Sequence, residues 1–173
     1  MQVTPPSSWI ARHAHLIPKP GPVLDLAAGS GRHTRYFKGL GYAVVAVDRD
    51  VSRLVDLVGD AQIEVIAADL EGGMPWPLGT RRFAGIVVTN YLHRPLFPKI
   101  AAALQQGGVL LYETFGAGNE KFGKPSNPDF LLQPGELLGF AEAEGLVVRA
   151  YHCGEVAEPG PAVLQRVAAV RHK

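Results

Sequence analysis

The sequence has little cysteine, no excess of charge of either sign and no long apolar run. Cys153 is the one cysteine, so an internal disulfide framework is excluded. A single cysteine is typical of proteins in a reducing cytoplasm, and we expect this one to be a buried structural thiol. Lys and Arg number 17 against 16 Asp and Glu, so no long-range attraction to nucleic acid is built in. No apolar run approaches the ~20 residues that span a bilayer. We therefore expect a cytoplasmic protein with neither a membrane nor a nucleic-acid partner.

The length and composition are typical of one globular domain. Hydrophobic residues make up 47% of the chain and charged residues 19%, and 173 residues are enough to bury a substantial core. Residues 1–22 lack the continuous apolar core of a secretory signal. Because no internal repeat is visible either, we predict a single domain over residues 1–173.

Short apolar runs alternate with helical segments between residues 23 and 115. We expect buried strands at residues 23–26, 43–48, 63–69, 83–90 and 109–115. Helices are expected at residues 32–40, near 51–58 and at 98–106, where Gly107 and Gly108 end the last one. This alternation predicts a parallel sheet covered by helices on both faces, with right-handed crossovers.

The regular alternation ends after Phe115. Residues 116–134 are rich in Gly, Pro and Asn without a clear period, and a structureless segment of this length is usually a lid or binding loop. A helix is expected over 135–144. Strands at 146–153 and 161–172 are expected to pair antiparallel.

The turn after the first strand contains Gly29 and Gly31. A phosphate-binding P-loop needs Lys and Ser or Thr after its glycines, whereas Arg32 and His33 follow Gly31. A dinucleotide-binding turn has a third glycine, and Thr34 stands in that position. Both phosphoryl transfer and NAD-dependent hydride transfer are therefore disfavoured.

Acidic residues lie at or near the ends of the first three predicted strands: Asp25, Asp48 and Asp69. Ligands of open α/β sheets bind at the carboxyl ends of the strands. Asp25 would repel a pyrophosphate but would suit an ammonium or a sulfonium group. Asp48 can accept hydrogen bonds from a ribose diol and Asp69 from an adenine amino group, with Leu70 beside the base. The three carboxylates favour a cationic, phosphate-free nucleoside such as S-adenosylmethionine.

The chain contains, in order, the stretches VLDLAAGSGRHT, VVAVDRD, IAADLEGGMPW, GIVVTNYLH and LQQGGVLLYETF. Together they resemble the successive motifs of class I S-adenosylmethionine-dependent methyltransferases. The resemblance implies a Rossmann-like three-layer α/β/α sandwich, whose mostly parallel sheet has seven strands in the order 3-2-1-4-5-7-6 and an antiparallel last strand. Residues 112–138 are also similar to a small bacterial branch of the tellurite-resistance and thiopurine type.

The resemblance further implies a cofactor site. By motif, its residues are Asp25, Ala27 in place of a commoner glycine, Gly29, Gly31, Asp48, Arg49, Asp69, Leu70 and Asn90. Asp25 would engage the methionine amino group through water, and Asn90 would contact the methionine portion through its backbone. Asp48 would bind the ribose hydroxyls. Arg49 would lie against the adenine, and Asp69 would face its amino group.

Methyl transfer from a sulfonium needs positioning and exclusion of water rather than a metal, so no metal site is expected. His93 is the candidate general base because imidazole titrates near neutral pH; the alternative is that it packs beside the following turn. Tyr91 either shapes the acceptor pocket or is an ordinary half-buried ring. The candidate substrate residues are Glu113, Asn119, Phe122 and Asn127.

We expect a methyltransferase that acts on a small-molecule acceptor by in-line displacement. The stretch TNYLHRP stands where related DNA methyltransferases hold a flipped base with an Asn-Pro-Pro-Tyr type sequence, which disfavours methylation of exocyclic amines in DNA. Two alternatives stay open: an RNA or protein methyltransferase that works with a partner, and a catalytically silent cofactor-binding regulator or scaffold. The fold alone names neither the acceptor nor the oligomeric state.

Overall fold

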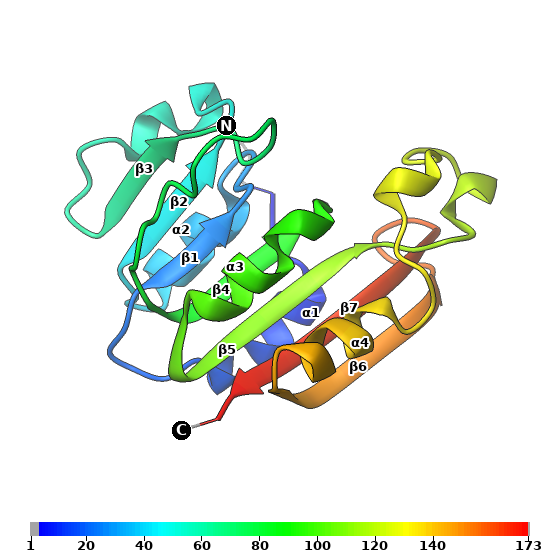
Figure 1. The fold of residues 1–173 in the computed structure, drawn as a ribbon. Coiled ribbons are helices and arrows are strands. Elements are labelled where there is room, and N and C mark those ends of the chain that lie inside the picture. The colour runs from blue at the N-terminus through cyan, green and yellow to red at the C-terminus, as the bar shows by residue number, and fades with distance from the viewer. Residues whose placement is uncertain (1–3, 173) are drawn as a thin grey trace.

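The computed structural model describes residues 4–172 and places seven strands in one sheet (Figure 1). The strands are β1 (Val23–Leu26), β2 (Val44–Asp48), β3 (Ile63–Ala67), β4 (Phe83–Thr89), β5 (Leu104–Phe115), β6 (Leu146–Val156) and β7 (Ala162–Arg171). Their order in the sheet is β3-β2-β1-β4-β5-β7-β6. β1 to β5 pair in parallel, and β7 runs antiparallel to both β5 and β6. The predicted fold class, strand order and antiparallel strand are confirmed.

Helices cover both faces of the sheet. α3 (Phe97–Ala102) and α4 (Glu136–Ala143) pack on one face, in front of the sheet in Figure 1, whereas α1 (Ser8–His13) and α2 (Arg32–Gly39) pack on the other. Because both faces are covered, the central strands are buried along their length and consist almost entirely of apolar residues. Short 3-10 helices connect these elements: η1 (Ala14–Leu16), η2 (Ser52–Leu57), η3 (Arg94–Leu96), η4 (Asn119–Lys121) and η5 (Pro128–Phe130).

The boundary between α3 and β5 lies earlier than predicted. α3 ends at Ala102 and β5 begins at Leu104, so the expected helix at residues 98–106 is wrong in its second half. Phe83 pairs with Leu104, but the register then shifts before the regular pairing of β4 with β5. A Cβ added at Gly108 would lie 2.9 Å from the carbonyl oxygen of Phe83. The glycine therefore permits an irregular strand start rather than ending a helix.

The helix expected near residues 51–58 is the 3-10 helix η2 rather than an α-helix. The Asp50 carboxylate accepts a hydrogen bond from the Ser52 N–H at 3.0 Å at its start. Leu54 and Leu57, three residues apart, are both buried, and three residues per turn is the period of a 3-10 helix.

Residues 116–134 are more ordered than predicted. Besides η4 and η5, they contain a parallel bridge between Gly116 and Leu132. Arg94 fastens the segment from outside, because its guanidinium donates to the carbonyl oxygens of Asp129 and Leu131, both at 3.0 Å, and pairs with Glu136. The segment is a packed loop and not a structureless one.

Two other expectations concern the outer surface. Cys153 is exposed, so the prediction of a buried thiol is wrong; it lies on β6, the edge strand of the sheet. Within residues 4–172, no helix is long and apolar enough to cross a membrane.

Candidate cofactor and acceptor site

Backbone strain is concentrated at the carboxyl ends of β1 and β4. Ala27 and Asn90 adopt left-handed conformations, with φ of 58° and 54°, at a cost of roughly 1 kcal/mol each. In the turn after β1, a Cβ on Gly31 would lie 2.5 Å from a Leu54 methyl carbon, whereas one on Gly29 would meet no atom within 4 Å. Gly31 is therefore required by packing, while Gly29 faces open space. Strain of this kind commonly marks functional sites.

The sequence-predicted residues after β1, β2, β3 and β4 meet around one cavity of about 190 Å³, called here the Asp48 cavity. Its lining consists of Ala27, Asp48, Arg49, Ala68, Asp69, Leu70, Glu71 and Tyr91. Only Ala68 and Glu71 of this set were not among the predicted site residues. Carboxylates, a guanidinium and a phenol thus converge where the rule for open α/β sheets places a ligand.

Backbone N–H groups orient two of the three carboxylates of the Asp48 cavity, those of Asp48 and Asp69. Asp48 Oδ2 accepts from the Gly29 N–H at 2.7 Å, and its Oδ1 accepts from the Asp50 N–H at 2.9 Å. Asp69 Oδ1 accepts from the Glu71 N–H at 3.0 Å. Since each carboxylate oxygen has two lone pairs, both groups keep the capacity to accept hydrogen bonds from a ligand.

Asp25 lies beneath the turn, 1% exposed. The Thr34 hydroxyl donates to Asp25 Oδ2 at 2.7 Å. Thr34, which stands where a dinucleotide-binding turn has its third glycine, is therefore the partner of this carboxylate. Burial raises the pKa of Asp25 from 3.8 to about 6 despite that hydrogen bond. The group is therefore largely ionised near neutral pH.

His33 makes a supporting contact beside the site that the sequence did not reveal. It is buried on α2, its Nε2 accepts from the Ser7 N–H at 3.0 Å, and its Nδ1 lies 3.4 Å from Thr89 Oγ1. Burial lowers the pKa of His33 to about 3, so the ring is neutral and Nε2 can accept. The contact ties the N-terminal segment to the end of β4. It joins residues far apart in the chain, which no local pattern announces.

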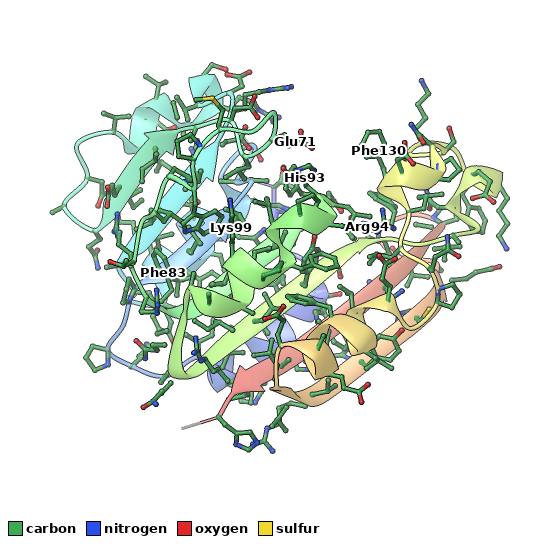
Figure 2. All side chains as sticks on the ribbon, in the orientation of Figure 1. Glu71, Phe83, His93, Arg94, Lys99 and Phe130 are labelled. Carbon is green, nitrogen blue, oxygen red and sulfur yellow. The ribbon has the colours of Figure 1, made fainter. Side chains whose placement is uncertain are left out.

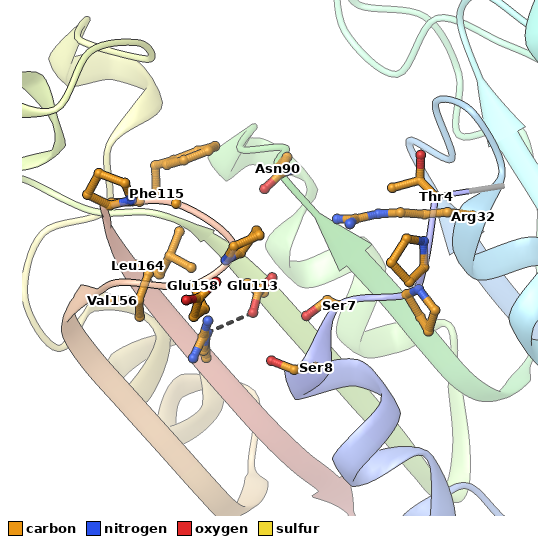
Figure 3. A pocket seen from close by; sticks show the side chains of 17 residues that line it. Thr4, Ser7, Ser8, Arg32, Asn90, Glu113, Phe115, Val156, Glu158 and Leu164 are labelled. Atoms are coloured by element: carbon orange, nitrogen blue, oxygen red, sulfur yellow. Dashed lines mark ion pairs between the residues drawn. The ribbon is translucent and has the colours of Figure 1, made fainter. Parts of the chain in front are cut away.

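Two further cavities adjoin the Asp48 cavity. The Phe130 cavity, of about 270 Å³, is lined by Glu71, Asn90, Tyr91, Leu92, Thr114, Phe115, Pro125 and Phe130. The Glu113 cavity, of about 630 Å³, lies between the N-terminal segment and the β6–β7 hairpin (Figure 3). Its lining includes Ser7, Arg32, Asn90, Glu113, Phe115, Val156, Glu158, Leu164 and Arg166. Glu71 and Tyr91 line both the Asp48 cavity and the Phe130 cavity, and Asn90 lines both the Phe130 cavity and the Glu113 cavity, so the three cavities are neighbours.

Of the two candidate catalytic residues, Tyr91 lines two of these cavities and His93 lies outside them. His93 Nδ1 is 3.1 Å from Glu71 Oε1, and Figure 2 shows the two side chains next to each other. The His93 ring lines none of the three cavities described above. Burial and nearby carboxylates raise the pKa of Tyr91 to about 12, so its phenol stays protonated near neutral pH and cannot serve as a base there.

Of the four predicted substrate residues, Glu113 alone lines one of these cavities. Asn119 is buried and braces the loop, because its Nδ2 donates to the Pro125 carbonyl and its Oδ1 accepts from the Val163 N–H, both at 3.0 Å. Asn127 Oδ1 caps η5, and Phe122 is 39% exposed. These three side chains shape the loop or its surface and line none of the described cavities, so their contact with a substrate stays a prediction.

Metal chemistry was not expected from the sequence. In the part of the chain that the structure describes, residues 4–172, no group of three or more His, Cys, Asp or Glu side chains is placed to hold a metal ion.

Comparisons with known proteins agree with this geometry. Residues 2–70 match the family model of tellurite resistance protein TehB. No curated protein matches the sequence at a significant level.

Many solved structures share the fold. A 1,6-didemethyltoxoflavin N1-methyltransferase from Burkholderia thailandensis, crystallised with 1,6-didemethyltoxoflavin and S-adenosylhomocysteine, is 21% identical with a TM-score of 0.69, over 95% of this chain and 76% of that one. The glycopeptide N-methyltransferase MtfA, in complex with S-adenosylmethionine, is 20% identical with a TM-score of 0.64, over 95% and 93%. An S-adenosylmethionine-dependent methyltransferase from Methanosarcina mazei is 12% identical with a TM-score of 0.72, over 98% and 99%. The chain therefore has the class I S-adenosylmethionine-dependent methyltransferase fold, and its N-terminal part is similar to the tellurite resistance protein TehB.

Proposed function

We propose that the chain binds S-adenosylmethionine and transfers its methyl group to a small-molecule acceptor. The observation that carries the proposal is the set of three neighbouring cavities at the carboxyl edge of the sheet. The Asp48 cavity has the groups that a nucleoside needs, and Asn90 and Tyr91 connect it to two spaces for an acceptor. Two of the structural neighbours were crystallised with S-adenosylmethionine, or with its product and a small-molecule acceptor, which supports the same assignment.

The residues around the Asp48 cavity have complementary tasks. Asp48 would accept hydrogen bonds from the ribose diol, and Asp69 would accept one from the adenine amino group. Leu70 offers an apolar contact to the base. Asp25 contributes a buried negative charge beneath the methionine end, where the ligand carries an ammonium. When bound, the cofactor supplies an activated methyl group, so the protein positions the acceptor and excludes water.

The size of the Glu113 cavity favours a small acceptor. About 630 Å³ lies within the roughly 300–1,000 Å³ that is typical of small-molecule sites. The N-terminal segment and the β6–β7 hairpin form its walls (Figure 3). His93 pairs with Glu71 and lines none of the three cavities, so we expect it to hold Glu71 in place rather than to act as the base.

Titration calorimetry with S-adenosylhomocysteine and with NAD tests the cofactor assignment. We expect S-adenosylhomocysteine to bind more tightly. The Asp48→Asn variant should weaken it by about 10- to 100-fold, because hydrogen bonds to a charged group are lost. Asp60→Asn is the matched control, since Asp60 precedes β3 at the opposite edge of the sheet and pairs with Lys38. Tighter binding of NAD, or equal losses in both variants, would contradict the proposal.

A further inference from the structure

Glu113 places a carboxylate in the wall of the Glu113 cavity, next to the predicted methionine end of the cofactor. It lies on β5, is 5% exposed, and lines the cavity (Figure 3). Its backbone carbonyl accepts from the Asn90 N–H at 2.9 Å. A ligand group held by this carboxylate would therefore lie beside the end of β4, where the cofactor's methionine portion is proposed to bind.

The charge of Glu113 is balanced, but its capacity to accept hydrogen bonds is not used. Glu113 Oε2 lies 2.7 Å from Arg166 Nε, on the neighbouring strand β7. The two atoms are not aligned for a hydrogen bond, and neither has another hydrogen-bond partner among residues 4–172. Buried polar groups without partners are rare in folded proteins and costly. Oε2 itself is enclosed, so a donor from a ligand in the cavity would bond to the other carboxylate oxygen, Oε1.

The remaining walls of the cavity are mostly apolar. Phe115, Val156, Leu164 and several prolines supply this lining, while Arg32 and Glu158 add one charge of each sign. A cation at Glu113 would leave the buried Arg166 charge uncompensated, and an anion would face the carboxylate; both are unfavourable at low dielectric. A neutral, largely apolar molecule with one N–H or O–H donor meets all of these conditions.

We propose that Glu113 determines acceptor specificity by accepting a hydrogen bond from an N–H or O–H group of a neutral, largely apolar acceptor. The inference rests on the proposed function, which places the cofactor beside Asn90. Glu113 thus fixes which face of the acceptor is turned toward the methyl group.

Matched pairs of small ligands test the inference on the full-length protein. The pairs are benzimidazole with 1-methylbenzimidazole, and 2-naphthol with 2-methoxynaphthalene, each titrated with and without saturating S-adenosylhomocysteine by ligand-detected NMR. The first pair reports an N–H donor and the second an O–H donor. We expect the donor-bearing member of at least one pair to bind about tenfold more tightly than its methylated partner.

Variants show whether Glu113 causes the preference. The Glu113→Leu/Arg166→Leu double variant removes the ion pair without leaving a buried charge, and such replacements are often tolerated; it should bind both members of a pair equally. Glu155→Gln is the control, because Glu155 lies on β6, is exposed, and pairs with Lys121. It should keep the preference. Thermal unfolding confirms that both variants are folded.

The outcomes separate this inference from the proposed function. No preference in either pair, or a preference that survives in the double variant, would overturn the role of Glu113. Failure of S-adenosylhomocysteine to bind would instead overturn the proposed function, while the titrations without it still report on Glu113.

Discussion

Replacing Asp25 by Asn is expected to stabilise the ligand-free protein at and above neutral pH while weakening cofactor binding. Asp25 is buried under the turn after β1, and burial raises its pKa from 3.8 to about 6. Between these two values the folded protein holds a proton that the unfolded chain has lost. The free energy of unfolding therefore falls as the pH rises from about 4 to 6 and stays lower above that range.

The size of the effect follows from the two pKa values. The difference between 3.8 and about 6 corresponds to about 3 kcal/mol of destabilisation at pH 8, since each tenfold change in proton affinity is worth about 1.4 kcal/mol. At pH 5 about half of this penalty is already present. The amide introduced by Asp25→Asn has no charge to bury, and its oxygen can accept the hydrogen bond from the Thr34 hydroxyl.

Urea unfolding of the wild type and Asp25→Asn at pH 5 and pH 8 measures the effect. The stability of Asp25→Asn relative to the wild type should rise by roughly 1 kcal/mol between the two pH values. Groups that titrate equally in both proteins cancel in this difference. A pH-independent difference would refute the reasoning, because Asp25 would then not bind its proton more tightly in the folded state. Calorimetry at pH 8 should show weaker binding of S-adenosylhomocysteine to the more stable variant.

Four further substitutions test the site and the loop beside it. Gly31→Ala should destabilise the protein by about 3 kcal/mol through strain and overpacking. Gly29→Ala should destabilise it by only about 1 kcal/mol but weaken S-adenosylhomocysteine binding. Equal melting temperatures of the two variants would contradict this expectation. Arg94→Met removes the hydrogen bonds to the carbonyl oxygens of Asp129 and Leu131 and should make residues 116–134 about tenfold more sensitive to limited proteolysis. An unchanged cleavage rate would show that the guanidinium does not stabilise the loop. His93→Ala should keep methyl transfer within about threefold, and a loss near a hundredfold with intact cofactor binding would establish His93 as the base.

The central strands and the convergence of the acidic residues were predictable because they follow from local patterns. β1 and β2 are short apolar runs bounded by turns, and they lie within a residue of where they were expected. Parallel strands place their carboxyl ends at one edge, so Asp48 and Asp69 had to come close once the sheet was recognised.

The supporting contacts were not predictable because they join segments far apart in the chain. The bond between His33 and Ser7 and the contact between Glu71 and His93 depend on how loops pack above the sheet. Thr34 is instructive: the sequence marks it only as a missing glycine, while the structure shows it as the partner of a buried carboxylate. The early start of β5 was missed because its first residues are polar and interrupted by glycines.

Transfer of a radiolabelled methyl group from S-adenosylmethionine measures the proposed activity directly. The protein, Asp48→Asn and the control Asp60→Asn are incubated with a cell extract, which is then separated into small-molecule, RNA and protein fractions. Label in the small-molecule fraction, lost in Asp48→Asn and kept in Asp60→Asn, is the predicted result. Label in RNA or protein, or no transfer by a chain that binds S-adenosylhomocysteine, would contradict it.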